Sequence, residues 1–470
     1  MKTLVMKFGG TSVGSVEAIT QAASIVEEYA QQCEHVVVVA SAMSGVTDAL
    51  IRCAQSAISE EESVFQGIID ALREKHHQTI EALLPDDDER VQLLAEIDAL
   101  LDELAAFCHS IHILGEATDR AMDAIISLGE RLNVRTVAAV LRQCGVNSQA
   151  VDAMDLIITD DKFQNAAPLM DKTRARVQER LVPMLEAGIV PVVTGFVGAT
   201  EEGLTTTLGR GGSDYTAAIL GDSVDADEVW TWTDVDGVMS TDPRIVPDAQ
   251  VIPTLSYSEV SELAYFGAKV LHPKTILPVV RRGIPLWVKN TFNPDYPGTR
   301  IVGEGDASLG KVKAVTLIKG MSMIIVEGRG MLGVPGIAAR TFAAVASQGA
   351  SVLMISQASS EQSICFVIPT PMVPLVVSAL EEELSRELER RDIDRIAALD
   401  DVVIVTVVGA GLRDTPGVSA RVFGATGQSD INVIAIAQGS SECGLSMVVR
   451  AADAQEAVQA IHSQVILNGG

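Results

Sequence analysis

Short apolar runs alternate with longer amphipathic segments from Met1 to about Ile301. The runs are rich in β-branched residues and predict strands at Thr3–Met6, Val36–Ala40, Val190–Val197, Glu228–Thr233 and Ile284–Lys289. Between them, apolar residues recur at helical spacing, as in the segment that follows Gly14. Strands that alternate with helices form a mostly parallel sheet that is covered on both faces. The pattern therefore predicts an α/β fold, a three-layer αβα sandwich.

Residues 59–114 depart from this alternation, because Leu, Ile and Ala recur at three- and four-residue intervals among many acidic residues. The helical pattern breaks at Pro85–Asp88, which predicts an inserted helical hairpin. Four histidines lie on its two arms, in positions that can resemble a metal site: His76, His77, His109 and His112. No cluster of cysteine or carboxylate ligands accompanies them, so we expect plain surface histidines.

Beyond about residue 310 the chain repeats itself at a constant offset of 81 residues. Pro335–Phe342 matches Pro416–Phe423, and Ile355–Glu361 matches Ile436–Glu442. Each copy has the pattern strand, Pro-Gly turn, helix, strand, polar turn and strand, which is the order of a small α+β module. Two copies of one module therefore follow the sandwich.

The Gly- and Asp-bearing stretch Gly303–Gly310 marks the boundary between these parts. We accordingly predict a first domain at residues 1–302 and two repeated modules at residues 311–398 and 399–470. The last strand of the second module is expected to pair back into the first module.

Two glycine-rich segments, Lys7–Ser12 and Gly209–Asp214, each lie between an apolar run and a helical pattern. Glycine lets the backbone approach a ligand closely, and the unpaired amides and positive end of the following helix attract an anion. Each segment also supplies a cation, Lys7 or Arg210. Neither segment has the spacing of a dinucleotide or Walker motif, so the sequence predicts a different phosphate cradle. A purely structural turn is the alternative interpretation.

Composition narrows the class of partner. The chain carries a formal net charge of −27. Because nucleic-acid binding depends on clustered Lys and Arg, this charge argues against a nucleic-acid partner and favours a small ligand. The six cysteines lack disulfide or zinc spacing, and we expect reduced thiols. The N-terminus shows no signal segment and no stretch has eighteen uninterrupted apolar residues, which predicts a cytoplasmic protein without a membrane span.

Two further segments place polar side chains beside apolar runs. Ser41–Asp48 follows a predicted strand, at the edge where open α/β sheets bind ligands. Its Thr47 is equally suited to cap a helix. Glu130, in Ser127–Leu132, can receive a ligand ammonium group or pair with Arg131 on its own helix.

Later segments offer contacts for a nucleotide. Thr233–Gly237 ends a Trp-bearing strand and is followed by Arg244, whose guanidinium suits phosphate groups, although a strand exit and a turn also explain this pattern. Lys269 lies between apolar residues in Gly267–Pro273, where a charge is costly unless it is paired or used. Phosphate contact is the use that we expect.

No Ser/His/Asp or His/Asp grouping in the sequence suggests a general base. Phosphoryl transfer needs mainly positioning and neutralisation of the phosphate oxygens. A carboxylate acceptor, with a reference pKa of about 4, is already ionised near neutrality and needs no base. The sequence offers cationic side chains but no general base, and this combination predicts a kinase that phosphorylates a carboxylate.

Six segments together resemble aspartate kinase, within the amino acid kinase superfamily: Lys7–Ser12, Ser41–Asp48, Ser127–Leu132, Gly209–Asp214, Thr233–Gly237 and Gly267–Pro273. The duplicated tail resembles the paired, ferredoxin-like ACT domains of that family, so the resemblance covers essentially the whole chain. Its two Gln-x-Ser-Ser-Glu turns are most similar to the kinase portion of threonine-sensitive aspartokinase–homoserine dehydrogenases. Because the chain stops at Gly470, we expect a monofunctional kinase without a dehydrogenase domain.

The resemblance implies transfer of the ATP γ-phosphoryl group to the side-chain carboxylate of L-aspartate. The products are 4-phospho-L-aspartate and ADP, and the reaction is the first step toward lysine, threonine, methionine and isoleucine. Mg²⁺ is expected on the ATP phosphates rather than in a cage of protein ligands. Met239 departs from the family pattern, because many relatives carry a tyrosine near the adenine at this position.

The resemblance also implies roles for single residues. Lys7 would neutralise the transferring phosphoryl group, and Asp214 would organise the cations. Arg210 would hold the α-carboxylate of aspartate and Glu130 its ammonium group, with Thr47 and Ser213 as neighbouring hydrogen-bond partners. The other expected ATP contacts are the N–H groups of Gly9 and Gly10 and the side chains of Thr233, Asp234, Arg244 and Lys269.

Gln357 and Gln438 occupy equivalent turns of the two modules. We expect them to bind an amino-acid effector, threonine first and lysine as the lesser possibility, while tying strand ends together is the alternative role. A homodimer or larger homo-oligomer through the ACT domains is expected from the resemblance alone. Two rival functions stay open: a kinase acting on glutamate, N-acetylglutamate or another acid, and a sensor whose kinase fold only binds ligand.

Overall fold

The computed structural model of the chain describes residues 3–59, 61–267, 271–303, 311–331, 334–357, 362–438 and 443–467. The chain packs into two compact units. The N-terminal unit comprises residues 1–238, 253–257 and 271–305. The C-terminal unit comprises residues 239–252, 258–270 and 306–470.

The N-terminal unit is built on one large sheet, whose described strands pair in parallel except for one antiparallel neighbour pair, β9 and β10. In spatial order the strands are β3 (Ser148–Val151), β4 (Val190–Thr194), β2 (His35–Ala40), β1 (Thr3–Phe8), β7 (Glu228–Thr233), β9 (Leu286–Asn290), β10 (Thr299–Val302) and β8 (Thr254–Ser256). The prediction of a mostly parallel α/β sheet is confirmed.

One predicted strand, Val190–Val197, is divided in two. Strand β4 ends at Thr194, and Phe196 adopts a left-handed backbone with φ of 67°. The chain then enters a small antiparallel hairpin of β5 (Val197–Ala199) and β6 (Thr205–Thr207). The sequence pattern predicted one strand across Gly195, but the turn at Gly195 and Phe196 redirects the chain away from the large sheet.

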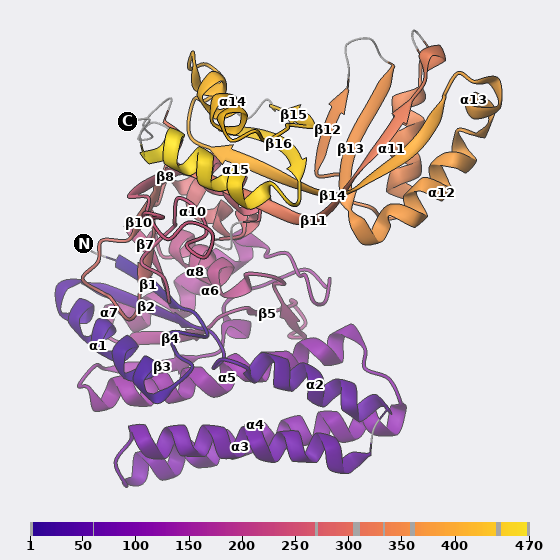
Figure 1. The fold of residues 1–470 in the computed structure, drawn as a ribbon. Helices are drawn as coiled ribbons and strands as arrows, with labels where there is room; N and C mark the ends of the chain where they lie inside the picture. The colour runs from indigo at the N-terminus through magenta and orange to yellow at the C-terminus, as the bar shows by residue number, and fades with distance from the viewer. Residues whose placement is uncertain are drawn as a thin grey trace. The chain divides into compact units, whose positions relative to one another are not determined.

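Helices cover both faces of this sheet (Figure 1). Alternate residues of β1 and β2 pack with α1 (Val16–Gln32) and α5 (Asp119–Gln143) in one apolar cluster. The helices α6 (Met170–Arg180), α8 (Gly212–Ser223) and α10 (Leu277–Arg282) pack together, with α8 against β1, β2 and β7, and the short helix α7 (Val182–Glu186) packs on β4. Because side chains alternate across a strand, each face of the sheet has its own core.

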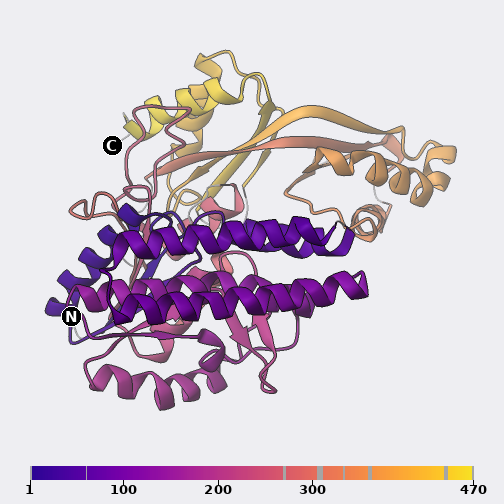
Figure 2. The same ribbon diagram turned by 90° about the horizontal axis from the view of Figure 1, so that it is seen from below.

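The predicted helical hairpin is confirmed as α3 (Glu62–Leu83) and α4 (Asp88–Leu114), which lie side by side in Figure 2. It packs on α2 (Val46–Ser59) and α5 within the same apolar cluster. Asp87 caps α4 by accepting the N–H of Arg90 at 3.0 Å. One histidine prediction was wrong, because His76 is fully buried in this packing rather than at the surface.

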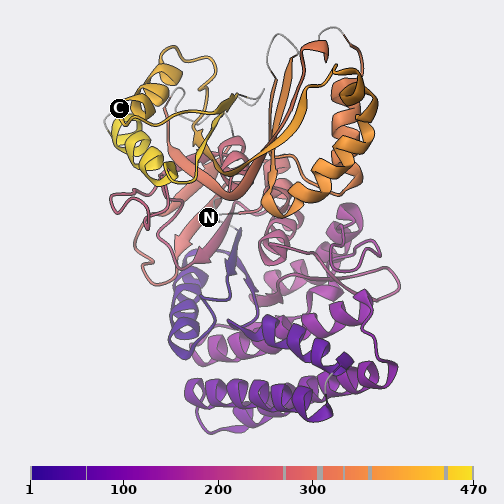
Figure 3. The same cartoon turned by 45° about the vertical axis from the view of Figure 1, so that its right-hand side comes forward.

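The C-terminal unit confirms the repeat. Each described element of the second module begins 81 residues after its counterpart: β11 (Ala314–Glu327) and β14 (Arg395–Val408), α11 (Ile337–Ser347) and α14 (Val418–Gln428), β12 (Met354–Gln357) and β15 (Ala435–Ala437), β13 (Ser363–Pro369) and β16 (Gly444–Arg450), α12 (Val373–Glu383) and α15 (Ala454–Ile461). The first module also has α13 (Ser385–Arg390). Figure 3 shows α11 and α12 at one end of the shared sheet and α14 and α15 at the other.

The two long strands, β11 and β14, join the modules into one sheet of order β12-β13-β11-β14-β16-β15. The start of β11 pairs with the end of β14, beside β16, while the end of β11 pairs with β13. We expected the last strand to pair back into the first module. That prediction was wrong, because β16 pairs with β14 and β15. The strand that connects the two modules is β11, the first strand of the tail, which pairs with β13 and with β14.

Two stretches from before residue 302 pack with the tail. Ile245 and Val246 lie in an apolar cluster with Val405 and Val458. The Ser240 carbonyl accepts the N–H of Val315 at 2.8 Å. Helix α9 (Tyr257–Tyr265) lies largely in this unit as well. Among the described helices of the chain, none combines the length and the apolar character needed to cross a membrane.

Candidate active site

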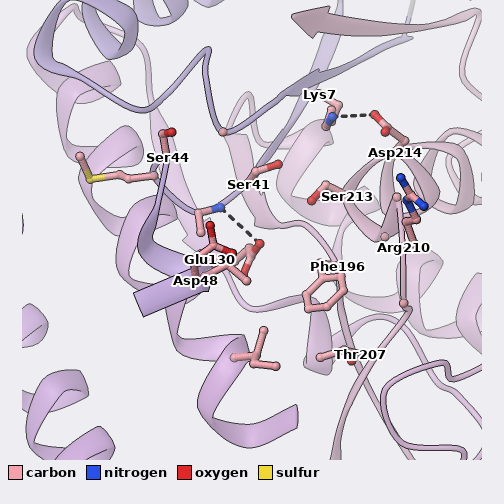
Figure 4. A pocket seen from close by; sticks show the side chains of 18 of the residues that line it. Lys7, Ser41, Ser44, Asp48, Glu130, Phe196, Thr207, Arg210, Ser213 and Asp214 are labelled. Carbon is pink, nitrogen blue, oxygen red and sulfur yellow. Dashed lines mark hydrogen bonds and ion pairs between the residues drawn. The ribbon is translucent and has the colours of Figure 1, made fainter. Parts of the chain in front are cut away.

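A cavity of about 610 Å³ opens at the carboxyl ends of β1 and β2 and beside the N-terminus of α8 (Figure 4). Its lining includes residues from four of the segments singled out in the sequence: Lys7–Ser12, Ser41–Asp48, Ser127–Leu132 and Gly209–Asp214. Carboxyl ends of parallel strands are the usual ligand edge of an open α/β sheet. The fold therefore brings these distant segments to one place.

Lys7 is held near the end of β1, in register with Val39 and Thr231 of the neighbouring strands. Its Nζ lies 2.6 Å from Oδ1 of Asp214, and the two side chains are 11% and 17% exposed. Asp214 belongs to the first turn of α8, where the helix carries partial positive charge. Lys7 is thus a largely desolvated cation that is kept in place by a carboxylate.

The first glycine turn packs closely on the loop after β2. A Cβ on Gly14 would lie 2.6 Å from the Gly10 carbonyl and 2.9 Å from Cβ of Ser44. Gly10 lines the cavity, whereas the N–H of Gly9 donates to the Trp232 carbonyl at 3.2 Å. The Gly9 amide is therefore used in the link to β7, and of the two predicted glycines Gly10 is the one that lines the cavity.

Glu130 projects into the cavity from α5 and is only 4% exposed. Its Oε1 accepts the N–H of Ala42 at 3.3 Å, and Oε2 has no partner among the described residues. Burial raises the pKa of this carboxyl to about 8. The alternative pairing within the helix does not form, because Arg131 lies 3.2 Å from Glu103 and 3.6 Å from Asp152. A buried carboxyl with an unused oxygen suits a ligand cation.

Arg210 stands in the turn before α8, between Gly209 and Gly211, which both have φ of 75°. This left-handed backbone favours glycine on either side of the arginine. Arg210 and Ser213 line the cavity on the side of Asp214, apart from Glu130, as Figure 4 shows. The site therefore presents a cation and a carboxylate on separate walls.

Thr47 also lines the cavity. Helix α2 begins at Val46, so Thr47 lies inside the first turn rather than at the capping position before it. Gly45, with φ of 79°, makes the turn into the helix. Thr47 therefore does not occupy the N-cap position of α2.

Several lining residues were missed from sequence, including Phe196, Gln164 and Thr207. The left-handed Phe196 is held by a hydrogen bond from its N–H to Oγ1 of Thr216 at 3.0 Å. A Cβ on Gly212 would lie 2.5 Å from Cδ2 of Phe196, so this glycine admits the ring. Gly195 was the local signal for the turn at Phe196, and no such signal in the sequence marked Gln164 or Thr207.

The predicted nucleotide residues are not all gathered at this cavity. Thr233 ends β7 beside β1, and its hydroxyl donates to Oδ1 of Asp234 at 3.2 Å. Arg244 belongs to the C-terminal unit, where its guanidinium lies 2.6 Å from Asp242 and is 87% exposed. Lys269 lies outside the described residues.

The predicted effector residues are both exposed in the C-terminal unit. Gln357 ends β12 and lines a cavity of about 310 Å³ with Pro335–Ala338 of the first module. Gln438 follows β15 at the equivalent position of the second module. No group of three or more His, Cys, Asp or Glu side chains among the described residues is arranged to hold a metal ion.

Comparison with known proteins agrees with this architecture. The model of the amino acid kinase family matches residues 2–290, and an ACT domain model matches residues 324–384 and 405–465. Aspartokinase 1, chloroplastic, of Arabidopsis thaliana is 33% identical over 99% of this chain and 81% of its own length. The bifunctional aspartokinase/homoserine dehydrogenase, chloroplastic, of Daucus carota is 40% identical over 99% of this chain, which spans about half (51%) of that relative.

Among solved structures, E. coli aspartokinase III in complex with aspartate and ADP is similar over 99% of this chain and 100% of its own, with a TM-score of 0.79 and 31% identity. A second structure of that enzyme, with lysine and aspartate, has a TM-score of 0.80 at the same identity. The family model covers more than half of the chain, and the sheet and cavity agree with it. The chain belongs to the amino acid kinase family.

Proposed function

We propose that this chain is an aspartate kinase, which transfers the γ-phosphoryl group of ATP to the side-chain carboxylate of L-aspartate and releases 4-phospho-L-aspartate and ADP. The observation that carries the proposal is one cavity with a buried, half-used carboxyl, Glu130, on one wall and Arg210 on another. Such a pair can bind the ammonium and α-carboxylate groups of a free amino acid. The aspartate and ADP bound to E. coli aspartokinase III support the same substrates.

Phosphoryl transfer to a carboxylate requires that the protein position the substrates and neutralise charge, and it does not require a general base. Arg210 would hold the α-carboxylate through parallel N–H bonds, and Glu130 would accept the ammonium group. Lys7, oriented by Asp214 at 2.6 Å, would neutralise charge on the transferring phosphoryl group. Thr47 and Ser213 would complete the hydrogen bonds to the acceptor. The acceptor carboxylate is ionised near neutral pH and attacks as it stands.

The cavity also fits Mg²⁺ carried on the ATP phosphates. Magnesium usually keeps waters and phosphate oxygens and takes one or two carboxylates from the protein. Asp214 and Asp48 are such carboxylates in the lining. Bound there, the ion would supply further neutralisation of the phosphate oxygens. The contacts of Thr233, Asp234, Arg244 and Lys269 with ATP remain part of the proposal.

Incubation with MgATP and a panel of acidic amino acids tests the function directly. Hydroxylamine traps an acyl phosphate as a hydroxamate, and we expect hydroxamate with L-aspartate alone. Hydroxamate with glutamate or N-acetylglutamate instead would assign the chain to a sister kinase. A chain that gives none with any acid, yet binds one, would be the sensor.

We further propose feedback inhibition through the ACT modules, with threonine as the effector and lysine as the second possibility. The exposed, equivalent positions of Gln357 and Gln438 support an effector site at each turn. Lysine is bound in one structure of E. coli aspartokinase III. An effector regulates only if it binds the active and inactive arrangements unequally. A homo-oligomer through these modules and a place at the start of lysine, threonine and methionine synthesis belong to the same proposal.

Kinase activity measured at increasing concentrations of threonine, and separately of lysine, shows which of the two amino acids inhibits. We expect Gln438→Ala to raise the threonine concentration for half inhibition by about tenfold, which is the loss of about 1.4 kcal/mol of binding. Gln455→Ala, at an exposed glutamine of α15, is the matched control and should leave the curve in place. Identical curves for wild type and Gln438→Ala, or inhibition by lysine alone, would remove the threonine proposal.

A further inference from the structure

Asp123 is a buried acid that the mechanism above does not use. It lies on α5 one turn after Asp119 and has no exposed surface. Its Oδ2 accepts two backbone N–H groups, from Gln164 at 2.9 Å and Thr207 at 3.0 Å. Its Oδ1 accepts the hydroxyl of Thr207 at 2.7 Å. One carboxylate therefore binds three donors from two separate segments.

Both partners line the cavity, although Asp123 itself does not. Thr207 is the last residue of β6 and is buried. Gln164 lies in the loop after Asp160, with φ of 65°, a backbone that a non-glycine residue adopts only when its surroundings impose it. The hydrogen bond to Asp123 is one such constraint. The acid thus shapes the wall of the site from behind.

This wall continues directly into the turn that carries Arg210. The Thr207 carbonyl accepts the N–H of Ala166 at 2.9 Å, which draws the loop onto β6. A Cβ on Gly209 would lie 2.9 Å from Oδ1 of Asn165 and 3.2 Å from the Gln164 carbonyl. The loop, the end of β6 and the Gly209 turn therefore pack as one body around the Asp123 carboxylate.

We propose that Asp123 is a positioning residue for the acceptor amino acid: it fixes the wall formed by Gln164 and Thr207, and through it the turn of Arg210. This inference rests on the proposed function, in which Arg210 holds the acceptor α-carboxylate. Asp123 does not touch the substrate. Its effect falls on the acceptor, because the clamp holds Gln164 and Thr207 beside the turn of Arg210, whereas Lys7 is positioned by β1 and by Asp214.

The ionised carboxylate is needed for this role, because it accepts all three donors. The side chain of asparagine is nearly the same size, and its one acceptor oxygen can still accept the two backbone N–H groups. It loses the negative charge, however, and its NH₂ group faces the Thr207 hydroxyl, which must turn from donor to acceptor. Asp123→Asn therefore weakens the clamp with little change in volume. Loss of a hydrogen bond to a charged group, followed by a small misplacement of the binding wall, is expected to weaken binding by about tenfold or more.

The test compares full-length wild type with Asp123→Asn in the hydroxamate assay. We expect KM for the acceptor acid to rise by about tenfold or more, while kcat and KM for ATP change by less than about threefold. Asp70→Asn is the matched control: Asp70 is exposed on α3, away from the cavity lining, and accepts the side-chain N–H of Gln66 at 3.1 Å. Its acceptor KM should stay within about twofold of wild type.

Thr207→Val provides a second variant should Asp123→Asn fold poorly. It removes the hydroxyl that donates to Asp123, and we expect a rise in acceptor KM. A direct contact between Thr207 and the substrate would also raise KM, so the two changes are combined. If the hydroxyl acts through Asp123, Thr207→Val has a smaller effect in the Asp123→Asn background than in wild type. Additive effects would overturn the clamp.

Calorimetric titration of L-aspartate into each protein keeps this inference distinct from the proposed function. A wild type that binds aspartate without making hydroxamate would defeat the kinase proposal, and the affinities of the variants would still test the clamp. Asp123→Asn with wild-type acceptor affinity, or with equal losses in acceptor KM, ATP KM and kcat, would overturn the positioning role. Wild type that binds no acid at all would overturn both proposals.

Discussion

At the scale of single residues, the site is defined by charges that the fold removes from water. Lys7 and Asp214 compensate each other at 2.6 Å, whereas Glu130 faces the cavity with one oxygen unpartnered among the described residues. An uncompensated buried carboxyl resists ionisation, and burial accordingly raises the Glu130 pKa to about 8. These are the features that point to a ligand carrying its own positive charge.

Replacing Lys7 by methionine should lower kcat by about 10²–10³-fold, because an oriented charge that stabilises the transition state is lost. Acceptor KM should change less, since Glu130 and Arg210 are intact. Steady-state kinetics measures both constants. Lys172→Met, at a half-exposed lysine paired with Glu201, is the control and should keep wild-type kinetics. A Lys7→Met enzyme with normal kcat would refute the role of Lys7.

The raised pKa of Glu130 predicts a pH-dependent stability for the unliganded protein. Between the ordinary value of 4.5 and about 8, the folded state holds a proton that the unfolded state has released. Stability due to this group is therefore fully present at low pH and falls as pH rises through that window. Thermal unfolding from pH 5 to 8 should show wild type losing stability relative to Glu130→Gln. Parallel curves would contradict the prediction.

Aspartate binding should show the opposite trend with pH. The ligand ammonium favours ionised Glu130, so affinity for L-aspartate is expected to rise from pH 6 to pH 8 in wild type. In Glu130→Gln the affinity should be weak and nearly independent of pH. Titration calorimetry in buffers with different ionisation enthalpies measures the affinity and the proton released together. Proton uptake, in place of release, would be inconsistent with this assignment.

At the scale of elements, close backbone packing positions the N-terminus of α8. A Cβ on Gly195 would lie 2.6 Å from both Cβ and Oγ of Ser213, in the first turn of that helix. The turn after β4 and the start of α8 are therefore in direct contact because residue 195 has no side chain. The sequence marked the glycines beside Arg210, but Gly195 belongs to another segment of the chain.

Gly195→Ala is accordingly expected to destabilise the protein by about 1–3 kcal/mol and to reduce activity, because the first turn of α8 must shift. Gly67→Ala is the matched control. Gly67 lies inside α3, with no heavy atom within 4 Å of the added Cβ. It should stabilise the protein by about 0.5–1 kcal/mol through helix propensity. Chemical denaturation of both variants measures the change in the free energy of unfolding. An unchanged free energy for Gly195→Ala would argue against close packing at this position.

At the scale of the whole molecule, the chain crosses between its two units several times. Residues 239–252 and 258–270 precede the predicted boundary but belong to the C-terminal unit. There Ser240 bonds to His462 at 2.8 Å, and Val246 is buried with Val405. The segment that includes Arg244 is therefore built into the unit that contains the ACT modules.

A chain truncated after residue 302 should lose this support. The Ser240 carbonyl would lose its bond from Val315, and Val246, now 9% exposed, would lose its apolar neighbours. We expect limited proteolysis to cut between residues 239 and 252 in the truncated chain, at a rate at least about tenfold above that in the full chain. Mass spectrometry locates the cuts. Equal resistance of the two chains would show that the segment folds without the tail.

Local pattern in the sequence determined which elements form. Short apolar runs rich in β-branched residues gave β1, β2, β4, β7 and β9 of the large sheet, whereas β3, β8 and β10 were not predicted. Helical spacing gave the α3–α4 hairpin, and the offset of 81 gave the two modules, because these signals depend on residues close in the chain or on a repeat. Resemblance of separate motifs gave Lys7, Glu130, Arg210 and Asp214 as site residues.

Only the tertiary structure decided what depends on distant partners. It placed Phe196, Gln164 and Thr207 at the cavity, left Glu130 without a partner for Oε2 among the described residues, and buried His76. It also paired β11 of the first module with β14 of the second, and it placed residues 239–252 in the C-terminal unit. Burial, desolvation and hydrogen bonds across many residues are properties of the assembled chain, and no local pattern of side chains contains them.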